Sequence, residues 1–271
     1  MVTVQARCFG GIPFKRRRTL TTLVLLPGLD GSGDFFDALC RQLPRQLRPQ
    51  VVRYPGDQPL SYSELASLVL AVLPEEGPFV LVAESFSGPV AIQVAAARPV
   101  GLMGVVLCAT FAQNPRPIFS PLQGLTRWAP VRAAPMGLLS SWLLGAEADA
   151  SWADRIRQAM NNCSVTVLRA RAREVLLVDV RSQLANIRVP VLYLQATCDS
   201  VVPTAALVDM QRVLPGLQVV RIDGPHFLLQ ARPVACAEQI TEFVGRPSPV
   251  ENQDGATATS VSPMRPCSTT N

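Results

Sequence analysis

Residues 80–88 read VLVAESFSG, and the turn inside this stretch decides the fold. The apolar run from Phe79 to Val82 is typical of a short strand that is buried on both faces. The run leads directly into Ser85, and the Ala- and Val-rich residues after it predict a helix over about 86–97. We therefore expect a strand, a sharp turn at a serine and a helix in immediate succession.

Ser85 is the candidate nucleophile of this turn. A serine at such a turn takes up a strained backbone, and only small residues two before and two after it avoid a clash. Those positions hold Ala83 and Ser87 where glycines are usual, and Gly88 comes one place late. Ser87 is the competing nucleophile, but Pro89 would then stand two residues after it. A serine between small residues also commonly caps a helix, so this segment alone leaves that interpretation open.

Short apolar runs continue to alternate with amphipathic segments on both sides of the turn. Strands are predicted at 23–26, 51–54, 103–108, 189–195 and 217–222, and helices at 34–47, 61–72, 204–214 and 231–244. Ser61 with Glu64 three residues later predicts a capping box at the second of these helices. Strands that alternate with helices predict parallel β-α-β units. We therefore expect an α/β fold with a mostly parallel central sheet and helices on both faces.

One long segment interrupts the alternation. Residues 111–187 contain no convincing strand, and they combine several prolines with amphipathic stretches. They predict a helical cap inserted between two parts of the core, 1–110 and 188–245, over the carboxyl ends of the strands. Residues 246–271 are rich in Ser, Thr and Pro and predict a disordered tail.

The composition favours a globular domain over a membrane or nucleic-acid-binding protein. Of the 271 residues, 48% are hydrophobic and 17% are charged, which allows a sizeable core. No uncharged apolar run approaches the roughly 18–20 residues of a membrane span, so no transmembrane segment is expected. The formal charge is +5, and its one dense basic run, Lys15–Arg18, has no interleaved aromatic residues. A solvated loop is favoured there over an anionic surface partner, and no nucleic-acid partner is expected.

The seven cysteines are scattered and odd in number, and none forms a CxxC pair. With a single histidine, no zinc site has a plausible spacing, so no metal is expected. Cysteines within apolar runs, such as Cys108, are typical of small buried residues in a reducing compartment. The basic run before Leu20–Leu26 is similar to a signal peptide, but the apolar stretch is short and lacks a small-residue cleavage site. A cytoplasmic protein is therefore expected.

The chain offers one base for the serine. A serine hydroxyl is a weak nucleophile, and His226 is the only histidine, located just after the last predicted strand. The acid that orients the imidazole is expected after the preceding strand, where Asp199 lies. Asp223 is nearer to His226 in sequence but is expected to end its strand and point elsewhere. Asp179 is a weaker reserve.

The loop PGLDGSGD at 27–34 is a candidate anion site. An oxyanion hole needs one N–H from such a loop and one from the residue after the nucleophile. The expected donors are the backbone N–H groups of Leu29 and Phe86. A phosphate cradle is the alternative, but the loop matches neither phosphate-binding glycine motif, and no nucleotide cofactor is expected.

Together these segments resemble the α/β-hydrolase-fold serine esterases. The resemblance covers about 20–245 and rests on LPGLDGSG at 26–33, AESFSGP at 83–89, IRVPV at 187–191 and GPHF at 224–227. Bacterial esterases and plant phytyl-ester-synthase-like acyltransferases carry similar PGxDG and ESFxG segments. The resemblance implies a triad of Ser85, Asp199 and His226, acyl-enzyme chemistry and no cofactor. Many relatives have His-Gly where this chain has Pro27-Gly28.

The sequence therefore predicts a serine hydrolase that cleaves carboxylic esters of small molecules through an acyl-enzyme. An acyltransferase or a thioesterase would use the same triad, with a small-molecule ester or thioester as acyl donor. A non-catalytic binding protein would keep the fold without the chemistry. Acyl length, alcohol moiety and oligomeric state do not follow from the sequence.

Overall fold

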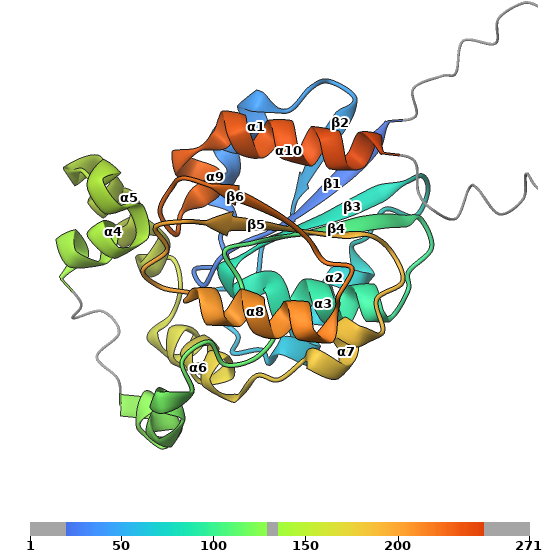
Figure 1. The fold of residues 1–271 in the computed structure, drawn as a ribbon. Coiled ribbons are helices and arrows are strands. Elements are labelled where there is room, and N and C mark those ends of the chain that lie inside the picture. The colour runs from blue at the N-terminus through green and yellow to red at the C-terminus, as the bar shows by residue number, and fades with distance from the viewer. Residues whose placement is uncertain (1–19, 129–134, 247–271) are drawn as a thin grey trace, which may run out of the picture.

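A computed structural model describes residues 20–128 and 135–246 of the chain (Figure 1). Its centre is one six-stranded sheet in the order β2-β1-β3-β4-β5-β6, and every neighbouring pair is parallel. The strands are β1 (Thr21–Leu26), β2 (Leu47–Val51), β3 (Phe79–Glu84), β4 (Leu102–Cys108), β5 (Val191–Ala196) and β6 (Gln218–Ile222). The predicted α/β fold with a parallel central sheet is confirmed.

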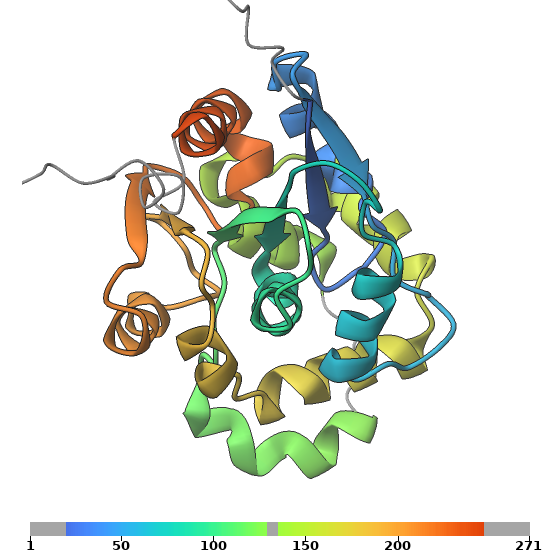
Figure 2. The same ribbon diagram turned by 90° about the vertical axis from the view of Figure 1, so that its right-hand side faces the viewer.

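Helices cover both faces of the sheet, as Figure 2 shows with the two layers on opposite sides. All six residues of β3 and of β5 are buried, because central parallel strands have a helix layer on each side. One layer contains α1 (Asp37–Gln42), α9 (Leu228–Ala231) and α10 (Pro233–Gly245). The other contains α2 (Tyr62–Ala71), α3 (Gly88–Ala96), α7 (Arg181–Ala185) and α8 (Thr204–Val213). The two apolar clusters that result make up the core.

The β2 region differs from the prediction of a helix over 34–47 and a strand over 51–54. The short 3-10 helix η1 (Asp34–Phe36) and α1 end by Gln42, and the strand begins at Leu47. Leu43 is extended, with φ −70° and ψ 136°, because the residue before a proline is pushed out of the helical region and Pro44 follows. β2 is an edge strand, and an edge strand tolerates the proline at position 49.

Between β4 and β5 most of the described residues are helical. It forms the 3-10 helix η3 (Pro117–Trp128), α4 (Met136–Leu144), the 3-10 turn η4 (Gly145–Glu147), α5 (Ala150–Asn161) and α6 (Val165–Leu177), followed by α7. Figure 1 shows α4 and α5 at the left end of the sheet and α6 at the lower left, below α8. Val178, Val180, Leu184 and Ile187 instead pack in the core with β3 and β5. We therefore propose the described residues of 117–128 and 135–177 as the body of the cap within the predicted segment 111–187.

Two predictions fall on parts of the chain without described structure. The predicted tail lies outside the described residues apart from Arg246, and so does the basic run at 15–18. Over the two described ranges, no helix is both long enough and apolar enough to cross a bilayer.

The predicted capping box at α2 is present and gives a local stability test. The Ser61 hydroxyl accepts from the Glu64 N–H, and the Glu64 carboxylate accepts from the Ser61 N–H at 2.7 Å. Ser61→Ala is expected to lower the free energy of unfolding by about 1 kcal/mol, measured by urea denaturation, because the Glu64 N–H loses its acceptor. Ser67→Ala on the exposed side of the same helix is the matched control. Its hydroxyl bonds only the Ser63 carbonyl one turn back, so stability should stay equal or rise slightly. Equal effects of the two substitutions would contradict this role of the cap.

Candidate active site

Ser85 sits on a left-handed turn between a strand and a helix. β3 ends at Glu84, the 3-10 turn η2 covers Ser85–Ser87, and α3 begins at Gly88. The φ angle of Ser85 is +50°, a region that residues with a side chain rarely adopt. A backbone of this kind persists only where surrounding contacts hold it, and such residues cluster at functional sites. The predicted sharp turn at Ser85 is thus present.

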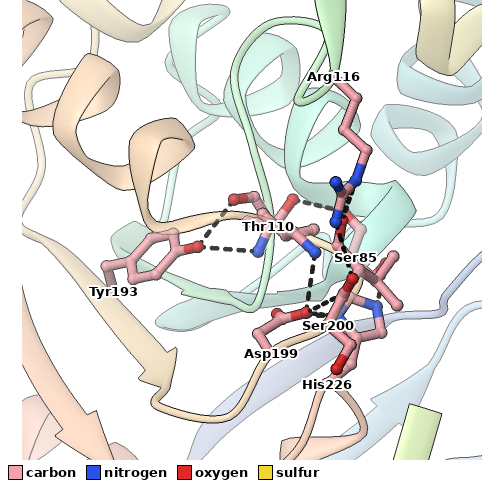
Figure 3. A network of polar contacts seen from close by, with 9 residues as sticks. Ser85, Thr110, Arg116, Tyr193, Asp199, Ser200 and His226 are labelled. Carbon is pink, nitrogen blue, oxygen red and sulfur yellow. Dashed lines mark hydrogen bonds and ion pairs between the residues drawn. The ribbon is translucent and has the colours of Figure 1, made fainter. Parts of the chain in front are cut away.

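The strands beside β3 hold this turn in place. The Thr110 hydroxyl, just beyond β4, donates to the Ser85 carbonyl. Thr110 is held in turn by Tyr193 of β5, whose hydroxyl accepts from the Thr110 N–H at 3.1 Å and donates to the Thr110 carbonyl at 2.8 Å (Figure 3). A Cβ at Gly88 would overlap the Thr110 side chain, so only glycine lets α3 start this close.

Ser87, the competing nucleophile, is engaged elsewhere. Its side chain is fully buried, its hydroxyl donates to the Pro27 carbonyl, and it shares a 2.7 Å hydrogen bond with the Tyr54 hydroxyl. The hydroxyl that replaces the usual glycine therefore ties the turn to the loop after β1. The Ser85 hydroxyl instead lies 2.9 Å from His226 Nε2.

His226 and Asp199 complete a chain of contacts with Ser85. His226 Nδ1 lies 2.9 Å from each carboxylate oxygen of Asp199, and the imidazole is only 2% exposed (Figure 3). A proton on Nδ1 facing the carboxylate leaves Nε2 free to accept the serine proton. The three residues follow β3, β5 and β6, so the parallel sheet delivers all of them to its carboxyl edge.

Asp199 is fixed by its own loop. Its Oδ1 accepts from the N–H groups of Val201 and Val202, both at 2.8 Å. Arg116, from the segment after β4, donates to the carbonyls of Ser200 and Val201 in the same loop. These hydrogen bonds therefore orient the Asp199 carboxylate independently of its contact with the imidazole.

The two alternative acids lie in other contacts. Asp223 accepts from the Thr197 hydroxyl at 3.0 Å and lies 3.6 Å from the Cys198 sulfur. Asp179 forms a two-pronged ion pair with Arg181. Of the three acids considered from the sequence, Asp199 is the one hydrogen-bonded to His226.

The loop after β1 brings its own turn to the site. The Gly31 N–H donates to the Gly28 carbonyl at 3.0 Å. In a trans peptide the C=O and N–H point in opposite directions, so the Leu29 N–H faces away from this turn. Phe86 is the second residue of η2, where an N–H has no acceptor within the helix. The geometry is compatible with the oxyanion donors predicted at Leu29 and Phe86, whose role stays a proposal.

A buried carboxyl group lies next to Ser85 in the chain. Glu84 is 3% exposed, and one of its oxygens accepts from the Gln230 side chain at 3.1 Å. Burial raises the pKa of Glu84 to about 8, although the Gln230 hydrogen bond opposes the shift. The other oxygen, Oε1, has no hydrogen-bond partner in the described part of the chain. Glu84 is therefore largely protonated in the folded protein at neutral pH.

A model of the Alpha/beta hydrolase family matches residues 23–239, which is most of the chain. The chain belongs to the alpha/beta hydrolase family. Membership of this family supports a hydrolase, while a more specific subfamily does not follow from the match. A search of curated proteins finds no significant match.

Solved structures share the fold at low identity. An enol-lactonase from Burkholderia xenovorans LB400 is 18% identical, with a TM-score of 0.73 over 86% of this chain and 94% of that chain. An esterase from Exiguobacterium antarcticum is 16% identical, with a TM-score of 0.73 over 83% and 92%. A bromoperoxidase from Bacillus anthracis, also 16% identical, has a TM-score of 0.71 over 83% and 92%. At these identities the similarity establishes the fold and nothing finer.

The residues that support the site could not be identified from the sequence. Thr110 and Tyr193 have no motif of their own, and they meet only because β4 and β5 are neighbours. The sequence places Glu84 directly before Ser85 but does not indicate that its carboxyl group is buried. Within 20–128 and 135–246, no group of three His, Cys, Asp or Glu side chains is arranged to hold a metal ion.

The buried Glu84 gives a pH test. Its carboxyl group ionises near its usual pKa of 4.5 in the unfolded chain but near 8 in the folded protein. The stabilisation that its proton brings is therefore complete below about pH 4.5 and is lost as the pH rises towards 8. Relative to Glu84→Gln, the free energy of unfolding of the wild type should fall by about 1.4 kcal/mol per pH unit in this window, measured by urea denaturation at several pH values. Parallel profiles for the two proteins would contradict a shifted Glu84.

Proposed function

We propose that the protein is a serine esterase that hydrolyses carboxylic esters through Ser85, His226 and Asp199. The observation that carries the proposal is the Ser85 hydroxyl 2.9 Å from His226 Nε2, on a backbone turn with φ +50°. A nucleophile and a base within hydrogen-bond distance, with the base oriented by a third group, form the arrangement used in acyl transfer.

In the first half-reaction, Ser85 Oγ attacks the ester carbonyl and its proton passes to His226 Nε2. The carbonyl oxygen becomes an oxyanion, which the N–H groups of Leu29 and Phe86 stabilise. The bond to the alkoxy group then breaks, and the alcohol leaves with the proton from His226. The product is an acyl ester on Ser85.

In the second half-reaction, His226 takes a proton from water, and the hydroxide attacks the acyl carbon. The bond to Ser85 Oγ breaks, the proton returns to Ser85, and the carboxylic acid is released. The buried Asp199 carboxylate stabilises the imidazolium that forms in both halves. No step requires a cofactor.

Aromatic side chains near the base support an apolar group in the substrate. The ring centroids of His226 and Phe227 are 6.3 Å apart, and those of Phe227 and Phe35 are 5.4 Å apart. The ring centroid of Trp152, in the cap, lies 6.3 Å from that of Phe35. The Phe227 N–H also donates to the Leu143 carbonyl at 2.8 Å, which joins the cap directly to the residue after the base.

A thioesterase or an acyltransferase would use the same groups, with a thiol as leaving group or an alcohol as acceptor in place of water. Free acid measured against transferred ester, with several acyl donors and alcohols, separates the three reactions. We also propose a reducing, cytoplasmic setting, which the free cysteines Cys40, Cys108, Cys198 and Cys236 support.

The nucleophile is tested with a fluorophosphonate probe, which reacts with activated serine hydroxyls. The wild type and Ser87→Ala should be labelled, because the Ser87 hydroxyl bonds Pro27 and Tyr54 and does not contact His226. Ser85→Ala should not be labelled and should lose hydrolysis of p-nitrophenyl esters. Labelling that survives Ser85→Ala, or an unlabelled wild type that spares all such esters, would sink the proposal.

The acid is tested with Asp199→Asn, which keeps the size of the side chain but removes its charge. We expect kcat to fall by a factor on the order of 10⁴, because an amide favours the wrong imidazole tautomer. The matched control is Asp223→Asn, in the neighbouring loop, which should keep kcat within a few-fold because Asp223 bonds Thr197. Steady-state kinetics with one p-nitrophenyl ester gives both values. A greater loss in Asp223→Asn would assign the acid to Asp223.

A further inference from the structure

Arg171 is a buried arginine that the mechanism above does not use. It projects from α6 of the cap. Arg171 is only 2% exposed and is one of the largest fully buried side chains of the described residues. Arginine is almost never fully buried unless it is paired. Yet the ion pairs found within the described ranges do not include Arg171. Burial also lowers the pKa of its guanidinium, so this position works against the charge.

Three backbone carbonyls, from the loops after β1 and after β2, accept from Arg171, and Nη1 also lies 3.7 Å from the Cys163 sulfur. Nη1 donates to the carbonyls of Leu29 and Asp30, at 2.8 and 2.7 Å. Nη2 donates to the Pro55 carbonyl, beyond β2, at 3.0 Å. One side chain of the cap thus holds two loops of the core, including the loop with the proposed oxyanion donor.

The loop is shaped to receive this side chain. Gly31 has φ +73°, a conformation that favours glycine. A Cβ at Gly31 would lie 2.5 Å from Nη1 and 2.9 Å from Cζ of Arg171. Any other residue at this position would push the guanidinium away from the carbonyls.

These contacts fix the two peptide planes on either side of Leu29. The Gly31 N–H holds the Gly28 carbonyl, and therefore the plane that carries the Leu29 N–H. Arg171 holds the Leu29 carbonyl, which belongs to the next plane. The start of the loop is fixed separately, by the Ser87 hydroxyl on the Pro27 carbonyl. Rotation of the Leu29 N–H out of the site would have to break at least one of these bonds.

We propose that Arg171 is a positioning residue for the oxyanion hole: the cap reaches through it into the loop after β1 and holds the Leu29 N–H in its productive orientation. This inference rests on the proposed function. It makes the oxyanion hole depend on the docking of α6, so the cap contributes to the chemistry as well as to substrate binding. A side chain that only filled space would be replaceable by an apolar side chain of similar size.

The test compares Arg171→Met and Arg171→Lys with Arg173→Met, an exposed arginine on the same helix. With a p-nitrophenyl ester, Arg171→Met should lose a factor of about 10²–10³ in kcat, the effect of losing one oxyanion donor, with KM within threefold. Arg171→Lys keeps a cation but not the fork and should lie between. Affinity for an alkyl boronic acid, which forms a tetrahedral adduct on the serine, should fall by the factor seen in kcat/KM. Arg173→Met should match the wild type in all three measurements.

A second readout does not depend on activity. Hydrogen–deuterium exchange of peptides that cover 27–34 should be faster in both Arg171 variants than in Arg173→Met, with exchange in β3 unchanged. If Arg171→Met fails to fold, as judged by circular dichroism, Arg171→Lys decides. Exchange in 27–34 equal to that of the control overturns the inference, and so does a loss in KM alone or a kcat within threefold of the control. A different outcome would reject only the esterase. If 27–34 exchanges faster in the Arg171 variants, but the wild type neither cleaves esters nor reacts with a fluorophosphonate, the positioning of the loop by Arg171 is retained.

Discussion

The left-handed backbone at Ser85 is the constraint on which the rest of the site depends. A buried strand must end, turn within one residue and start a helix, so that the hydroxyl stands clear of the sheet. Such a backbone costs on the order of 1–3 kcal/mol and has to be held by its surroundings. Thr110 holds the Ser85 carbonyl, and Tyr193 holds Thr110. The turn is thus supported from β4 and β5 as well as from its own chain.

The parallel sheet then brings the other residues of the site to Ser85. Because all strands run in one direction, the loops after β3, β5 and β6 meet at one edge and bring three distant residues into contact. Residues of the core and of the cap also contact this edge. Glu84 lies buried with Gln230 beside Ser85, and the cap contacts the site at Phe227 and the loop after β1. Core, edge and cap therefore form one connected set of contacts.

Features set by local sequence could be predicted. The buried runs gave the strands, Ser61 and Glu64 gave the helix cap, and the order of Ser85, Asp199 and His226 along the chain matched the strand ends. The edge strand was placed four residues late, because LRPQV carries a weak pattern and its pairing with β1 supplies the stability. Thr110 and Tyr193 could not be found from sequence, since their roles depend on which strands are neighbours. The spacing of Arg171 does indicate that it is buried. It lies three and four residues after the buried Leu168 and Val167, on the same face of α6.

Ester hydrolysis by the proposed mechanism passes through a covalent acyl group on Ser85. The most direct measurement is to mix the protein with a p-nitrophenyl ester, quench with acid within the first turnovers, digest, and locate the acyl group by mass-spectrometric fragmentation. We expect the mass of one acyl group on Ser85, and a higher yield of this adduct when deacylation is slowed. An acyl group on Ser87 or on the exposed Cys198, or continued ester cleavage with no acylated residue, would contradict it.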